Sequence, residues 1–145
     1  MTKEFKGRTI VAGDITGTAM VSRNGLNTLA TFYAGMADKS PICHDQDNPD
    51  LYKKHIAGTI LCIPKTIGST TGGMILQCAA KLGIAPKAIL YSEHIDTVSA
   101  AGILLSYIWD KNPIVCIDQL GEDFLKNVHE GDTISVHKDG RVTVG

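Results

Sequence analysis

The chain has no run of about 20 apolar residues, the length that a helix needs to cross a membrane. Residues 1–7 are charged and lack the apolar core of a signal peptide. Nor does either sign of charge dominate, since 14 basic residues stand against 15 acidic ones. This balance argues against nucleic acid or an anionic membrane as the main partner, because both select a basic surface. We therefore expect a cytoplasmic protein with neither kind of partner.

The cysteines lack the spacing of a metal or redox motif. No two of the four stand in a Cys-x-x-Cys pattern. Cys62 and Cys116 lie inside apolar runs, where a reduced thiol packs as a small hydrophobic side chain. Cys43 is followed by His44, and such a pair could hold a metal or a thiolate. Two ligands are fewer than metal sites usually use, so we favour a structural role for this pair.

Short apolar runs bounded by turn residues predict strands, and two longer apolar segments predict helices. The expected helices are residues 74–82, ending at Gly83, and residues 97–109. Residues 34–54 lack a pattern, and so long a segment indicates a functional loop. The expected strands are residues 8–13, 17–22, 59–64, 88–91, 114–117, 133–137 and 141–144.

The order of these segments predicts the fold class. Two strands and a long loop precede a β-loop-α-β-α-β series, and a hairpin ends the chain around Asp139 and Gly140, a strong turn signal. With 145 residues, the chain has the length of one domain with one core. We expect an α/β domain with mixed parallel and antiparallel strands.

The segment Gly-Ser-Thr-Thr-Gly-Gly at residues 68–73 joins a predicted buried strand to a predicted buried helix. Ligands of open α/β sheets collect at this end of the strands, and a helix N-terminus there suits a carboxylate or phosphate. Its glycines allow close approach, and one hydroxyl could become a general base if a partner draws away its proton. No Lys-Ser/Thr pair closes the segment, so it is not a P-loop. A plain helix N-cap explains the same residues.

Other polar residues are weaker candidates. Residues 93–96 (Glu-His-Ile-Asp) and Asp118 follow predicted strands and could line the same cleft. Lys65 could attract an anion. His55 and His94 are isolated histidines, more typical of ordinary surface or core positions. No Ser-His-Asp set in a nucleophile-elbow context and no metal-ligand cluster stands out in the sequence.

Six segments, in order along the chain, carry a resemblance to a known family. They are residues 7–22, 32–38 (Phe-Tyr-Ala-Gly-Met-Ala-Asp), 44–51, 56–64, 68–72 and 83–89 (Gly-Ile-Ala-Pro-Lys-Ala-Ile). Together, in order and spacing, they resemble the small subunit, or swivel domain, of the aconitase X family. The resemblance covers most of the chain.

This resemblance implies a single swivelling β/β/α domain over residues 1–145, docked on a large subunit that carries an iron–sulfur or iron site. The family's pairs dehydrate small hydroxy acids, among them a hydroxyproline and a phosphorylated mevalonate. The family's proton acceptor is a serine that corresponds to Ser69. Metal ligands belong to the large subunit, so none is expected here. The remaining loop residues are the expected substrate-binding groups: Gly68, Thr70, Thr71 and Gly72.

The chain also departs from the family pattern. Tyr33-Ala34-Gly35 replaces an aromatic-Gly-Gly segment, Ala37 stands where proline is common, and residues 39–44 are unlike the usual Thr-Gly. These departures leave the substrate open. Two other functions also stay open. One is a non-catalytic module whose loop binds a carboxylate or phosphate metabolite, and the other is a stand-alone enzyme that uses Cys43 and His44.

Overall fold

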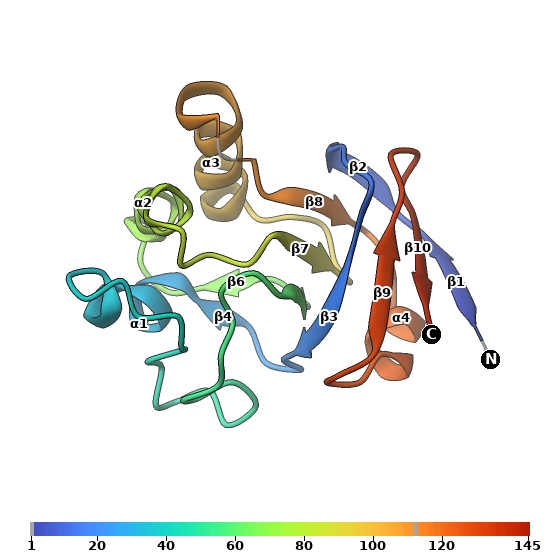
Figure 1. Ribbon diagram of the computed structural model, residues 1–145, viewed down its shortest axis with the longest axis horizontal. Helices are drawn as coiled ribbons and strands as arrows, with labels where there is room; N and C mark the ends of the chain where they lie inside the picture. Colours follow the sequence, from blue (N-terminus) through green and yellow to red (C-terminus); the bar gives the residue numbers. More distant parts are fainter. Residues whose placement is uncertain (1, 112) are drawn as a thin grey trace.

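The protein is built on a mixed β-sheet (Figure 1). Residues 2–111 and 113–145, which the computed structural model describes, form one eight-stranded sheet of order β1-β10-β9-β3-β5-β7-β8-β2 and a two-stranded sheet of β4 and β6. The strands are β1 (Lys3–Lys6), β2 (Arg8–Val11), β3 (Ile15–Val21), β4 (Leu26–Asn27), β5 (Ile60–Ile63), β6 (Thr66–Ile67), β7 (Ala88–Tyr91), β8 (Val115–Asp118), β9 (Thr133–Val136) and β10 (Arg141–Val144).

The centre of the large sheet is parallel and its flanks are antiparallel, as the sequence predicts. Strands β3, β5, β7 and β8 run in the same direction, whereas β1, β10, β9 and β2 pair antiparallel with their neighbours. Every residue of β5, β7 and β8 is buried, which is typical of strands covered on both faces. The carboxyl ends of β3, β5 and β7 therefore meet at one edge of the sheet.

Helices cover both faces. Helices α1 (Thr28–Phe32), α2 (Gly72–Leu82) and α3 (Thr97–Leu105) lie on one face, and the short α4 (Glu122–Asn127) lies on the other. Helix α3 continues as a π-helical turn, Ser106–Asp110, so the predicted helix over 97–109 has the right extent but a different winding at its end. Within the described residues no helix has the length and apolar character needed to span a bilayer.

Helices α2 and α3 touch through their backbones. A Cβ atom on Gly102 would overlap the carbonyl oxygen of Gly73, and one on Gly73 would lie 2.7 Å from the carbonyl oxygen of Val98. Only glycine allows this approach at both positions. The first turn of α2 is thereby fixed against α3, and α2 begins directly after residues 68–71.

The N-terminal segment supplies the strands at both ends of the large sheet. Strand β1 pairs with β10 at one side of the sheet, and β2 pairs with β8 at the other. Gly7 joins the two strands and donates its N–H to the carbonyl oxygen of Gly140 at 3.0 Å. The sheet and α4 share a second core, in which the Phe5 ring meets the Phe124 ring edge-on at 5.3 Å between centroids.

An ion pair between a buried carboxylate and a half-exposed arginine ties β2 to β8. Arg8 donates from Nε to Asp118 Oδ1 at 2.9 Å and from Nη2 to Asp118 Oδ2 at 2.7 Å. The Asp118 side chain is fully buried and also accepts the N–H of Ile95 at 2.8 Å. Burial alone would raise the pKa of Asp118, but the hydrogen bonds from Arg8 and Ile95 outweigh it and hold that pKa below its usual value.

We predict that Asp118 contributes stability that acid removes. A lowered pKa in the folded state means that this contribution is present above the unfolded value, about 3.9, and is lost as the pH falls through the folded value. The Asp118→Asn variant should be less stable at pH 7 by roughly 1–3 kcal/mol. Its stability should also fall less steeply than that of the wild type on acidification below about pH 4. Urea unfolding at a series of pH values measures both effects, and equal slopes for the two proteins would contradict the prediction.

Candidate functional site

The hydroxyl loop, residues 68–71, lies exposed between β6 and α2 at the carboxyl edge of the parallel strands. The hydroxyl oxygens of Ser69 and Thr71 are 2.9 Å apart, and Ser69 Oγ accepts the N–H of Thr71 at 3.1 Å. The N–H of Gly72 donates to the carbonyl oxygen of Ser69 at 2.9 Å. The loop is therefore a closed turn that presents the Ser69 hydroxyl to solvent.

The hydroxyls of this loop do not act as a simple helix cap. Thr71 occupies the N-cap position of α2 but makes no side-chain hydrogen bond to the helix. The Ser69 side chain bonds to Thr71 outside the helix instead of an N–H in its first turn. The N-cap explanation from the sequence thus accounts for the position of these residues but not for the direction of their side chains.

Two residues that the sequence analysis did not single out pack against the glycines of the loop. Gly68 has a φ of +98°, and a Cβ there would lie 2.8 Å from the side-chain amide of Asn27. A Cβ on Gly72 would overlap Thr28 Oγ1. Both glycines are required by these contacts, and Gly68 also by its backbone angle. The residues that hold the loop come from β4 and α1, whose short length gives little signal in the sequence.

Asp96 fixes the base of the loop. Its carboxylate accepts the N–H of Thr66 at 3.0 Å, the hydroxyl of Thr66, and the N–H of Ser99 at 3.0 Å as the N-cap of α3. The hydroxyl of Ser99 donates to Thr66 Oγ1 at 3.0 Å. Burial would raise the pKa of Asp96, but the hydrogen bonds from Thr66 and Ser99 outweigh it and lower that pKa. Asp96 is therefore ionised at neutral pH.

The other candidate residues from the sequence make their contacts away from this loop. Asp118 is committed to Arg8, and His94 Nε2 lies 3.4 Å from Nη2 of the same arginine. His55 Nε2 lies 3.0 Å from the carbonyl oxygen of Ala57 in the irregular segment before β5. Lys65 is exposed next to β6. Of the candidates after β7, Asp96 alone is seen to bond to the strand that leads into the hydroxyl loop.

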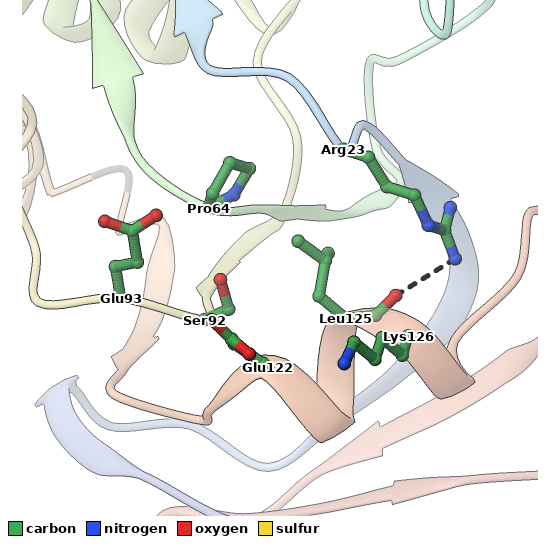
Figure 2. Close-up of a pocket in the computed structure, with 7 residues that line it drawn as sticks. All are labelled: Arg23, Pro64, Ser92, Glu93, Glu122, Leu125 and Lys126. Atoms are coloured by element: carbon green, nitrogen blue, oxygen red, sulfur yellow. Dashed lines mark hydrogen bonds between the residues drawn. The ribbon is translucent and has the colours of Figure 1, made fainter.

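A pocket of about 270 Å³ lies at the same edge of the sheet, beyond the ends of β3, β5 and β7. Figure 2 shows Glu93 and Glu122 on one side of it and Arg23 on the other, with Leu125 between them. Arg23 donates from Nη2 to the carbonyl oxygens of Leu125 and Val128, both at 3.0 Å, so it also holds the end of α4. The lining residues are Arg23, Pro64, Ser92, Glu93, Glu122, Leu125 and Lys126.

The two thiols that the sequence predicts to be structural, Cys62 and Cys116, are buried. Cys62 and Cys116 are fully buried, and burial raises the pKa of both. Cys43 is also fully buried, and its burial raises the pKa of the thiol, which lies 3.8 Å from Thr31 Oγ1. His44 Nε2 lies 3.0 Å from Ser40 Oγ. A buried, protonated Cys43 is a poor nucleophile, which speaks against an enzyme built on Cys43 and His44.

Among residues 2–111 and 113–145, no group of three or more His, Cys, Asp or Glu side chains is placed to hold a metal ion. The hydroxyl loop thus offers a candidate base and hydrogen-bond donors.

Comparisons with known proteins agree with this picture. Residues 4–144 match the family described as aconitase X swivel domain. The phosphomevalonate dehydratase small subunit of Methanocella arvoryzae is 30% identical over 133 residues, which are 92% of each chain. The cis-3-hydroxy-L-proline dehydratase of Pseudomonas aeruginosa is 33% identical over 81% of this chain, but over only 19% of its own length.

A solved structure has the same fold over the whole chain. The crystal structure of aconitase X from Thermococcus kodakaraensis, in its holo-form, superposes with a TM-score of 0.80 at 30% identity. The match covers 99% of this chain and 98% of that one. With the family match over residues 4–144, it confirms the resemblance seen in the sequence and the expected fold. The chain belongs to the aconitase X swivel-domain family.

Proposed function

We propose that this chain is the small subunit of a dehydratase that removes water from a small hydroxy acid, and that Ser69 is the proton acceptor. The observation that carries the proposal is the exposed Ser69 hydroxyl, held in a closed turn at the carboxyl edge of the sheet. The relatives named phosphomevalonate dehydratase small subunit support the reaction class. We further propose that residues 1–145 form one swivel domain and that Gly68, Thr70, Thr71 and Gly72 contact the substrate.

The chemistry of dehydration explains the features of the loop. Loss of water beside a carboxylate needs a base for the proton on carbon and an acid for the departing hydroxyl. Ser69 would take the proton, and the N–H of Thr71, 3.1 Å from Ser69 Oγ, would stabilise the negative charge that develops there. The positive end of the α2 dipole adds to this effect. An iron–sulfur or iron site on the large subunit would supply the Lewis acid for the departing hydroxyl.

The exposure of the loop supports a partner that covers it. A serine hydroxyl is a poor base in water, so the site needs an environment from which water is excluded. Large apolar side chains flank the loop in sequence: Ile67 before it is 49% exposed, and Met74 in the first turn of α2 is 57% exposed. Exposed apolar side chains next to a polar site are typical of a surface that another protein covers. We propose the large subunit as that protein and the cytoplasm as its location, where the free, reduced thiols would persist.

We predict that Ser69→Ala removes most of the activity without changing the fold. We take phosphomevalonate as the probe substrate, because relatives are named for it. In the complex with the large subunit, kcat for this probe should fall by about 10²- to 10⁴-fold, the usual contribution of a general base. The thermal midpoint of the isolated chain should stay the same, because the side chain is exposed. Thr70→Ala is the matched control, since it removes a neighbouring hydroxyl and should cost much less. Full turnover by the Ser69→Ala complex would refute the role of Ser69.

A separate binding experiment distinguishes the alternative of a non-catalytic module. Calorimetric titration of the isolated chain with phosphomevalonate should show no binding at micromolar concentrations, because the proposed site is incomplete without the large subunit. Tight binding by the isolated chain, together with a complex that has no dehydratase activity, would favour the metabolite-binding module.

We also predict that Met74→Glu weakens association with the large subunit. A carboxylate in place of Met74 would place an unpaired charge in the covered surface, which should raise the dissociation constant at least tenfold. Thr133→Glu is the control, because Thr133 is exposed and lies on β9, next to the C-terminal end of the chain and away from α2. Surface plasmon resonance measures both variants. Equal affinities for wild type and Met74→Glu would show that the interface lies elsewhere.

A further inference from the structure

We propose that Asp96 is a positioning residue for Ser69 and acts through Thr66. This inference rests on the proposed function, because it concerns the placing of the proposed base. The carboxylate of Asp96 holds Thr66 by both its N–H and its hydroxyl. Thr66 begins β6, the strand that leads into the hydroxyl loop.

The bonding pattern needs an ionised carboxylate. Asp96 faces three donors at once, namely the N–H and the hydroxyl of Thr66 and the N–H of Ser99. A carboxylate has only acceptor sites and can satisfy all three, whereas an amide or a protonated acid would turn a donor toward one of them. The Thr66 hydroxyl in turn accepts from Ser99 Oγ, so each hydroxyl in the chain has a defined direction.

The loop has few other fixed points. Strand β6 has two residues, and within the described part of the chain its strand partner is the two-residue β4; a pairing this short is marginal by itself. Beyond it, Gly68 rests on Asn27 and Gly72 rests on Thr28. Asp96 also caps α3, whose backbone touches that of α2 at Gly102 and Gly73. One carboxylate therefore ties the start of the hydroxyl loop to the same helix that fixes its end.

If Ser69 is the proton acceptor, its hydroxyl must be held in a defined position. A proton acceptor that is displaced by about 1 Å can lose on the order of 10²-fold in rate, while substrate held mainly by other groups still binds. Loss of the contacts between Asp96 and Thr66 should therefore lower kcat and leave KM nearly unchanged. A residue that only stabilises the fold would not produce this split.

The test uses Thr66→Val, which removes the hydroxyl but keeps the volume and the N–H, and Thr66→Ser, which restores the hydroxyl. In the complex with the large subunit, Thr66→Val should lower kcat for phosphomevalonate 10- to 100-fold with KM changed less than threefold, and Thr66→Ser should recover most of it. Asp96→Ser should resemble Thr66→Val, because serine still caps α3 but is too short to hold Thr66.

Hydrogen exchange of the isolated chain tests the positioning without activity. In Thr66→Val, the amides of Thr71 and Gly72, which bond to Ser69, should exchange at least tenfold faster, while those in the middle of α2 keep their protection. Asp118→Asn is the matched control, since Asp118 holds the adjacent Ile95 but is not bonded to β6. If exchange is faster in Thr66→Val but the Ser69→Ala complex keeps full turnover, Asp96 still positions the loop and Ser69 is not the base. Unchanged exchange and unchanged kcat in Thr66→Val would overturn the inference.

Discussion

The pairing of the N-terminal segment with both sides of the large sheet holds this fold together. Strands β1 and β2 are separated only by Gly7, yet they bond to β10 and β8 at opposite ends of the strand order. Both end strands of this sheet belong to one short segment, and Phe5 of that segment packs against the second core, where it meets Phe124. The parallel strands that carry the candidate site are thereby held in a fixed frame.

Two carboxylates hold the segment after β7: Asp118, which is buried, and Asp96, which is partly buried. Asp118, at the end of β8, accepts the N–H of Ile95. Asp96, the residue after Ile95, caps α3 and accepts the N–H of Thr66. Both have lowered pKa values because hydrogen-bond donors outweigh the effect of burial. The Ser69 loop is thus firmly held at its base and exposed at its tip. Such a loop suits a site that two proteins build together, since one supplies an oriented group and the other supplies the enclosure.

Much of the large sheet could be predicted from the sequence, because β5 and β7 are short runs without charged residues and lie close to glycine or proline. Residues 88–91 form a strand with the predicted limits, and the hairpin around Gly140 follows from its turn residues. Strand β1 was missed because three of its four residues are charged, and its place depends on pairing with a strand at the other end of the chain. Helices α1 and α4 were missed because five or six residues give too little periodicity.

The candidate site was predictable only in part, for a related reason. Glycines and hydroxyls at 68–72 are adjacent in sequence, so their pattern is visible there. The pairing of β4 with β6 brings three further residues close to this loop: Asn27, Thr28 and Thr66. No local sequence pattern predicts this pairing. Asp96 was placed in the cleft by its position after a strand, whereas its bonds to Thr66 depend on the folded structure.

The pairing of β1 with β10 also brings the two ends of the chain together, with Lys3 opposite Val144. In Figure 1 both termini lie on the far side of the molecule from α1 and α2, the helices that border the hydroxyl loop. A polypeptide could therefore enter or leave at either end without crossing the site. Because of this geometry, a gene fusion could join the domain to another domain at either its N-terminal or its C-terminal end. The hydroxyproline dehydratase relative, in which the matched region is 19% of a longer chain, is consistent with such a history.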